Sequence, residues 1–268
     1  MTDATGNARL QIFQNAEELG RALAGRLLGE IAKARQAGHR FIVGCPTGRS
    51  PRTTYSAIAR RLAADPQDLS QLILVMMDEY AIEHGDRFQH APSSEPWSCH
   101  HFARREILDP WNEYLPKNFQ LPASSVWFPE AENPEAYDAR IANAGGIDFF
   151  ILASGASDGH VAFNPAGTPR DSRTRIVALS EQTRRDNLQT FPAFGTIDAV
   201  PRYGVSMGIA TITTAREAVM ILTGSSKRES LARVVAADQY DSTWPATIIH
   251  EFSAGEILAD REAAVDLG

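Results

Sequence analysis

The sequence predicts an α/β fold in which a doubly wound, mainly parallel sheet is flanked by helices in a Rossmann-like arrangement. Short apolar segments of strand length alternate along the chain with longer segments whose apolar residues recur at helical spacing. The short segments are apolar at nearly every position, as expected of strands that helices cover on both faces. The chain has 268 residues, 43% of them hydrophobic, and no low-complexity tract, so we expect a single domain over residues 1–268.

The first part of the chain contains two predicted helices and two predicted strands. The first helix covers residues 16–37, where leucine or isoleucine recurs every fourth position, and it ends before a glycine. A buried strand follows over residues 40–45. Ser50 and Pro51 predict the N-cap and the first residue of the second helix. The second buried strand covers residues 72–77.

Later segments repeat this alternation. The predicted helices lie near residues 134–144, over residues 181–190 and after residue 225, and the predicted strands cover residues 147–153 and 218–223. A long irregular stretch with Gly, Pro and Ser runs over residues 83–97. Such stretches are surface loops or active-site lids, and we predict a lid segment around residues 83–110.

Composition argues against several classes of function. The formal net charge of −7 argues against a nucleic-acid partner, because phosphate neutralisation needs clustered Lys and Arg. No apolar run approaches the roughly 18 residues of a membrane span, and residues 1–13 lack a secretion signal, so we expect no membrane partner and a cytoplasmic location. Cys45 and Cys99 lie far apart without metal-ligand spacing, so we expect neither a disulfide nor a bound metal.

The turn after the first strand is a candidate anion site. In open parallel sheets, ligands bind beyond the carboxyl ends of the strands. The turn comprises Thr47, Gly48, Arg49 and Ser50. Its glycine lets backbone amides approach an anion at the start of the next helix, although an ordinary capped turn has a similar composition.

Two adjacent carboxylates, Asp78 and Glu79, follow the second strand and precede Tyr80. A carboxylate at this edge of the sheet can act as a general base when partial burial raises its pKa. The alternative is that both residues start a solvated loop.

Asp158 and His160 lie two residues apart in a glycine-containing turn directly after the strand over residues 147–153. Both side chains can therefore face one pocket, where an aspartate can orient a neighbouring imidazole or favour its charged form. The alternative is a structural histidine.

Three later segments carry cations in this acidic chain, over residues 172–175, 183–185 and 224–227. The second contains Arg184, and the third places Lys227 at another strand-to-helix turn. They can bind an anion, or they are solvated surface charges.

In this order, the segments resemble the glucosamine-6-phosphate deaminase family, whose relatives include the 6-phosphogluconolactonases. The resemblance runs from about residue 41 to residue 227 and rests on the order and spacing of the motifs together. The motifs are Thr47-Gly48-Arg49-Ser50-Pro51, Asp78-Glu79-Tyr80, Gly146-Ile147-Asp148, Asp158-Gly159-His160-Val161-Ala162-Phe163-Asn164, Ser172-Arg173-Thr174-Arg175, Thr183-Arg184, and Val200-Pro201 leading into Met207-Gly208.

The resemblance implies a chemistry for three of these residues. Asp78 would be the base that moves a proton between C2 and C1 of a sugar, and His160, supported by Asp158, would help open the pyranose ring. An aldose would become a ketose, and an amino sugar would also lose ammonia. No metal or organic cofactor is implied.

The resemblance also implies the groups that bind a small anionic sugar. The phosphate-binding positions fall on the 47–50 turn, Arg184 and Lys227, and Glu79 and Gly159 complete the expected substrate-binding set. Because the family commonly forms homo-oligomers, we expect a homo-oligomer here.

The sequence departs from the family pattern at several places, two of which are described here, and it leaves three functions open. Pro165 stands where the family has a glutamate that completes the ring-opening triad, and Arg49 replaces a small residue. The first function is an amino-sugar phosphate deaminase/isomerase, which the Asp78 motif favours. The second is changed chemistry, an isomerase of a non-amino anionic sugar or a lactone hydrolase, which Pro165 favours. The third is a non-catalytic sugar-phosphate sensor, against which the retention of Asp78, Asp158 and His160 argues.

Overall fold

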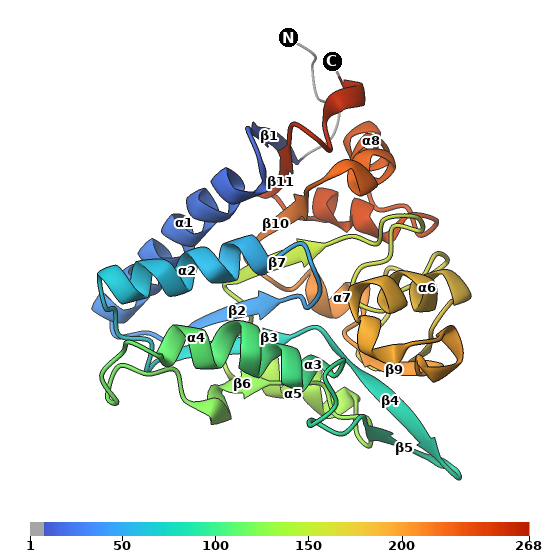
Figure 1. Cartoon of the computed structure of the whole chain (residues 1–268), viewed down its shortest axis with the longest axis horizontal. Helices are drawn as coiled ribbons and strands as arrows, with labels where there is room; N and C mark the ends of the chain where they lie inside the picture. The colour runs from blue at the N-terminus through green and yellow to red at the C-terminus, as the bar shows by residue number, and fades with distance from the viewer. Residues whose placement is uncertain (1–7, 268) are drawn as a thin grey trace.

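The computed structural model describes residues 8–267 and has a seven-stranded sheet at its centre. Every neighbouring pair of strands in this sheet is parallel. Its strands are β1 (Arg9–Phe13), β2 (Phe41–Cys45), β3 (Leu72–Met76), β6 (Val126–Trp127), β7 (Phe149–Ala153), β10 (Glu217–Leu222) and β11 (Gly255–Asp260). Their order is β1-β11-β10-β7-β2-β3-β6, so the chain winds outward from β2 through β3 to β6 and then returns to β7 (Figure 1). This topology confirms the predicted fold class.

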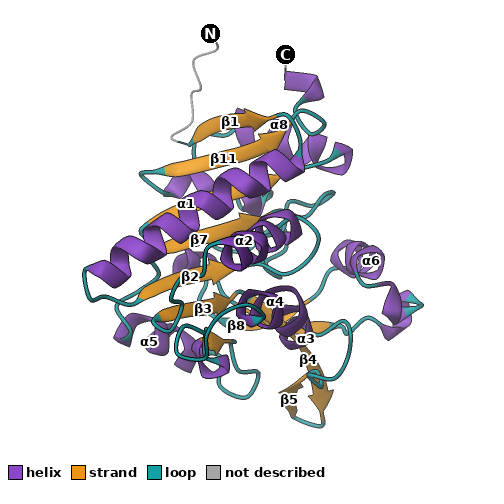
Figure 2. Cartoon of the chain, turned by 60° about the vertical axis from the view of Figure 1, so that its left-hand side comes forward, coloured by secondary structure: helices purple, strands orange, loops and turns teal. Residues whose placement is uncertain are grey.

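Helices cover both faces of the sheet. The helices α1 (Ala16–Gln36) and α2 (Arg52–Ala64) cross one face (Figure 2), and α5 (Glu135–Asn143) and α8 (Arg228–Ala236) pack on the other. Successive side chains of a strand point to opposite faces, so Val43 of β2 joins the first core and Ile42 the second. Both cores consist of buried apolar residues, which explains the continuous apolar runs in the sequence.

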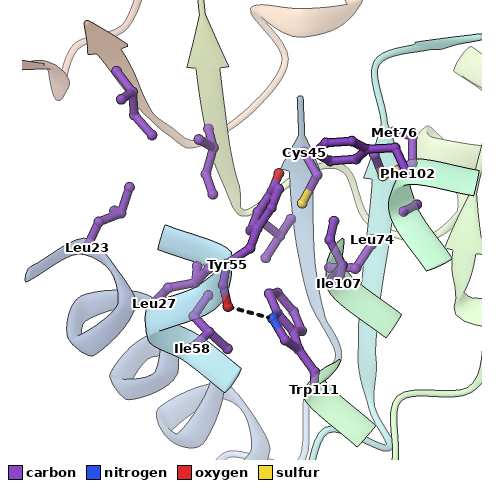
Figure 3. Packing of buried hydrophobic residues seen from close by; sticks show 14 of the residues in the cluster. Leu23, Leu27, Cys45, Tyr55, Ile58, Leu74, Met76, Phe102, Ile107 and Trp111 are labelled. Carbon is purple, nitrogen blue, oxygen red and sulfur yellow. Dashed lines mark hydrogen bonds between the residues drawn. The ribbon is translucent and has the colours of Figure 1, made fainter. Parts of the chain in front are cut away.

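The core beneath α2 fixes the turn that follows β2. Tyr55 and Trp111 are fully buried and pack edge to face, with ring centroids 6.0 Å apart (Figure 3). The indole Nε1 of Trp111 donates to the Tyr55 carbonyl at 3.1 Å, and the Tyr55 hydroxyl donates to the Pro46 carbonyl at 2.8 Å. These bonds connect the core to the first residue of the turn over residues 46–50 and hold that turn in place.

A second, antiparallel sheet of four strands adjoins the carboxyl end of β3. Its strands are β4 (Asp78–His84), β5 (Arg87–His90), β8 (Arg175–Ala178) and β9 (Tyr203–Ser206), in the order β5-β4-β9-β8. Met77 alone separates β3 from β4. No pattern in the sequence predicts this sheet, and the prediction of an irregular stretch over residues 83–97 is wrong for the part that lies in the hairpin of β4 and β5.

Shorter elements complete the chain. They are α3 (Cys99–Ala103), the π-helix η1 (Arg104–Leu108), α4 (Asp109–Asn112), α6 (Glu181–Thr190), α7 (Ile209–Ile212), and the 3-10 helices η2 (Ala123–Ser125), η3 (Pro192–Phe194), η4 (Ile197–Ala199), η5 (Ser225–Lys227), η6 (Pro245–Glu251) and η7 (Val265–Leu267). The helix α2 begins at Arg52 with Pro51 at its N-cap and no capping side chain, so the predicted Ser50 cap is wrong. Within residues 8–267, no helix combines the length and apolar character that crossing a bilayer requires.

Candidate active site

A cavity of about 340 Å³ opens at the carboxyl ends of β2, β3, β7 and β10, where the sequence analysis expected a ligand. Five segments line it: the turn over residues 46–50, residues 77–80, the loop that follows β7, the helix α6 and residues 223–227. Figure 1 shows α6 lying beyond the arrowheads of β2 and β7, that is, beyond their carboxyl ends.

Asp78 is a buried carboxylate on the cavity wall, with 6% of its surface exposed. Burial raises the pKa of Asp78 to about 7, and the nearby charge of Glu79 acts in the same direction, whereas a hydrogen bond from Cys99 and the charge of His160 lower it. The Cys99 thiol donates to Asp78 Oδ1 at 3.4 Å. A carboxyl group that titrates near neutral pH is suited to accept and return a proton.

Glu79 lies outside the cavity, although it was expected to bind substrate. Asp78 and Tyr80 line the cavity, and the pleat of β4 turns the side chain between them to the opposite face. The Glu79 carboxylate is fully buried and accepts the backbone amides of Cys99 and His100, at 3.0 and 2.9 Å, and His100 Nδ1 at 2.6 Å. It therefore fixes the start of α3 beside Asp78.

His160 lines the cavity and has Asp158 behind it. Asp158 Oδ1 lies 2.6 Å from His160 Nδ1, and Asp158 Oδ2 accepts the Thr183 hydroxyl at 3.0 Å. Burial alone would raise the pKa of Asp158, but the hydrogen bonds and charge of His160 outweigh it and lower this pKa to about 2. Asp158 thus remains ionised and orients the imidazole.

Gly159 does not line the cavity, but it makes the turn between Asp158 and His160 possible. Its φ is 64°, in the left-handed region, and a Cβ there would lie 2.5 Å from the Trp244 ring. Gly159 therefore shapes this turn through its backbone.

The turn after β2 and Lys227 form a cationic end of the cavity. Thr47, Gly48, Arg49 and Ser50 all line it, and Gly48 has a φ of 90°. Burial and the positive charge of Arg49 lower the pKa of Lys227 to about 8, against the opposing charges of Asp186 and Asp158. Neither cation forms an ion pair within residues 8–267, so the two suit an anionic group of a ligand.

Arg184 does not reach the cavity. Its guanidinium donates to the carbonyls of Ile197, at 2.6 Å, and of Val200, at 3.0 and 3.2 Å. It secures the segment that follows α6.

The cavity face of α6 was missed in the sequence analysis. Asp186, Asn187, Gln189 and Thr190 line the cavity. Asp186, Asn187 and Thr190 lie three, four and seven positions after Thr183, the spacing of one helix face, so this signal was available. The Asn187 Nδ2 is buried and forms no hydrogen bond of normal geometry within the described part of the chain.

Pro165 does not line the cavity, so nothing at this position faces His160. The neighbouring Asn164 is buried and used structurally: its Nδ2 donates to the Met207 carbonyl at 2.7 Å, and its Oδ1 accepts from Arg175 at 2.9 Å.

One cluster has atoms close enough to share a cation. An oxygen of Asp158, an oxygen of Asp186 and a ring nitrogen of His160 all lie within 4.8 Å of one another. His160 Nδ1 already pairs with Asp158, and a histidine held in this way is also suited to proton transfer.

The family model described as glucosamine-6-phosphate isomerases/6-phosphogluconolactonase matches residues 14–258. The chain belongs to this family. Among curated relatives in the family, the glucosamine-6-phosphate deaminase of Shouchella clausii is 30% identical over 257 residues, which cover 94% of each chain. That of Beutenbergia cavernae is 34% identical over 226 residues, covering 83% of this chain and 80% of the relative.

Solved structures of the family have the same architecture. A structure described as a monomeric glucosamine-6-phosphate deaminase superposes with a TM-score of 0.79 at 29% identity, over 96% of this chain and 99% of the other. The 6-phosphogluconolactonase of Trypanosoma cruzi superposes with a TM-score of 0.69 at 16% identity, over 97% of each chain. The second likeness concerns the fold alone.

Proposed function

We propose that this protein is an enzyme that opens the ring of an amino-sugar phosphate of the glucosamine-6-phosphate type, isomerises the aldose to a ketose phosphate and releases ammonia. The observation that carries this proposal is the pairing of a buried Asp78 carboxylate with the Asp158–His160 dyad in one cavity that has a cationic end. The family and its deaminase relatives support the same activity.

Ring opening is the step proposed for His160. The imidazole accepts the proton of the anomeric hydroxyl and returns a proton to the ring oxygen, while the bond between C1 and the ring oxygen breaks and C1 becomes a carbonyl carbon. Asp158 stays ionised and holds the imidazole by a 2.6 Å contact, so the cationic intermediate form is stabilised where it arises.

Asp78 then moves a proton from C2 to C1. Removal of the C2 proton, together with protonation of O1 by solvent, gives an enolamine, and return of the C2 proton at C1 gives an iminium ion at C2. Water adds to that carbon, and the resulting carbinolamine expels ammonia and leaves the ketone. Because burial raises the pKa of Asp78 to about 7, the same carboxyl group can take and give the proton near neutral pH.

The phosphate is proposed to lie at the cationic end, between Arg49, Lys227 and the amides of the 47–50 turn. Two positive charges and free backbone donors suit a dianionic group. With the phosphate there, the sugar ring extends toward Asp78 and His160, which line the same cavity.

The test is the release of ammonia and ketose, assayed together, from glucosamine-6-phosphate and galactosamine-6-phosphate. The wild type should release both products in equal amounts, and the isosteric Asp78→Asn variant should lose at least about 100-fold in rate, the lower end of what a general base contributes. Hydrolysis of 6-phosphogluconolactone is measured in parallel, because the family includes lactonases. Lactone hydrolysis without ammonia release would replace the deaminase proposal.

The homo-oligomer and the cytoplasmic location stay predictions. One solved relative is described as monomeric, so membership of the family does not by itself imply a homo-oligomer. Light scattering of the purified protein measures the assembly, and fractionation of the source cells measures the location.

A further inference from the structure

The helix α6 brings a second carboxylate to the ring-opening histidine. Asp186 lies one turn after Thr183, whose hydroxyl binds Asp158, and its side chain lines the cavity. One of its oxygens lies within 4.8 Å of both an Asp158 oxygen and a ring nitrogen of His160. His160 therefore has carboxylates from two different segments beside it.

The position of the Asp186 carboxylate is fixed by neutral donors. The Ser157 hydroxyl lies 3.1 Å from Oδ2 and 3.4 Å from Oδ1, and the Gln182 side-chain amide donates to Oδ1 at 3.1 Å. Over residues 8–267, no lysine or arginine forms an ion pair with it. Its negative charge is thus held in place without a cation that neutralises it by contact.

We propose that Asp186 is a positioning residue for ring opening. Its carboxylate stabilises the cationic form of His160, which exists while the proton passes from the anomeric hydroxyl to the ring oxygen. An opposite charge within about 4–6 Å favours the charged form of an ionisable group. The imidazolium charge is shared by both ring nitrogens, so a carboxylate other than Asp158 adds to its stabilisation. This inference rests on the proposed function.

The position of Pro165 fits this role. The proline supplies no acid and does not line the cavity, so the chain has no carboxylate at the position where the family resemblance places one. Asp186 comes from another element and, with Asp158, places a second carboxylate oxygen within 4.8 Å of a ring nitrogen of His160.

The variant that tests the role is Asp186→Asn, which keeps the shape of the side chain and removes its charge. The matched control is Glu181→Gln, five positions earlier on α6, where an exposed carboxylate pairs with Arg185. We expect kcat with glucosamine-6-phosphate to fall by about 10- to 100-fold in Asp186→Asn, less than the loss of a full acid–base group, and to stay within about 2-fold in the control. KM should not rise, because loss of this anion leaves the charge of Lys227 less compensated.

A substrate isotope effect separates ring opening from the later proton transfer. With substrate deuterated at C2, Asp78→Glu gives the reference value for slow cleavage of the C2–H bond. In Asp186→Asn, ring opening becomes the slow step, so the isotope effect on kcat should be smaller than that reference. The variant Ser157→Ala removes one hydrogen-bond donor to Asp186. It should lower kcat by about 2- to 10-fold, which corresponds to the loss of one hydrogen bond. This variant replaces Asp186→Asn in the test if Asp186→Asn does not fold.

Two results would overturn the role of Asp186 and leave the proposed function standing. In the first, the wild type has deaminase activity and the kcat of Asp186→Asn lies within 2-fold of the wild-type value. In the second, the isotope effect in Asp186→Asn equals that in Asp78→Glu. A wild-type enzyme that releases no ammonia would instead overturn the proposed function, and this role with it.

Discussion

Replacement of Cys99 should shift the pH dependence of the proposed reaction, because its thiol donates a hydrogen bond to Asp78, the proposed general base. The Cys99 Sγ lies 3.4 Å from Asp78 Oδ1, and burial raises the pKa of the thiol well above its usual range, so the sulfur keeps the proton that it donates. A hydrogen bond to the ionised form lowers the pKa of a carboxyl group. In Cys99→Ala, Asp78 therefore loses a contact that favours its carboxylate.

The size of the shift follows from the bond. A net hydrogen bond contributes about 0.5–1.5 kcal/mol, and one pKa unit corresponds to about 1.4 kcal/mol, so the pKa of Asp78 should rise by about 0.5–1 unit above its value of about 7. Because the reaction needs the carboxylate in the free enzyme, the acid limb of kcat/KM should move up by the same amount. At pH 6, kcat/KM should fall by about 3- to 10-fold, and at pH 9 it should be unchanged.

The assay is ammonia release from glucosamine-6-phosphate between pH 5 and 9, with Cys99→Ser as the matched variant that keeps a donor. We expect the acid limb of Cys99→Ser to lie closer to the wild type than that of Cys99→Ala. An acid limb in Cys99→Ala that stays in place, or that moves to lower pH, would refute the reasoning.

Two further predictions concern charge in the cavity. Lys227→Met should raise KM by about 10- to 100-fold through loss of a charged hydrogen bond. Because burial lowers the pKa of Lys227 to about 8, the kcat/KM of the wild type should decline above pH 8. Lys227→Arg should remove that decline, since an arginine keeps its charge at this pH. Asp78 has a folded-state pKa of about 7 against about 3.8 unfolded, so the folded protein binds more protons between these values and loses stability as pH rises through them. Asp78→Asn should therefore raise the thermal midpoint by several degrees more at pH 8 than at pH 4, as measured by calorimetry; an equal change at both pH values would contradict the assigned shift.

The parallel sheet could be predicted because its strands carry their own signal. β3 and β7 are apolar at every position since helices cover both faces, and such runs are unambiguous beside amphipathic helices. The antiparallel sheet carries no such signal. β9 is four residues long, and it pairs with β4 more than 100 positions earlier, so neither composition nor local spacing indicates the contact.

The same difference explains which site residues were found. Asp78, Asp158, His160 and Lys227 follow strands, and the topology of a parallel sheet gathers strand ends at one edge. The direction of a side chain is a separate matter. Glu79 follows a strand too, but it sits inside β4, whose pleat turns it away, and Arg184 is a cation whose partners are carbonyls after the helix. Because side chains alternate along a strand, a strand predicted over residues 78–84 would place the side chains of Asp78 and Glu79 on opposite faces.

The missed sheet also explains how the base and the histidine are held at a fixed separation. Asp78 pairs with Ser206 in the register of β4 and β9, and the Ser206 hydroxyl accepts the backbone amide of Phe163 at 3.1 Å. Phe163 lies three residues after His160, so one strand connects the segment of the base to the segment of the ring-opening group. The burial that raises the pKa of Asp78 and the hydrogen bonds that fix its backbone thus have one cause, which is the direct passage of the chain from the parallel sheet into the antiparallel one. A base on a flexible loop would be hydrated and would titrate near its ordinary value, so the second sheet is as necessary to the proposed proton transfer as the carboxylate itself.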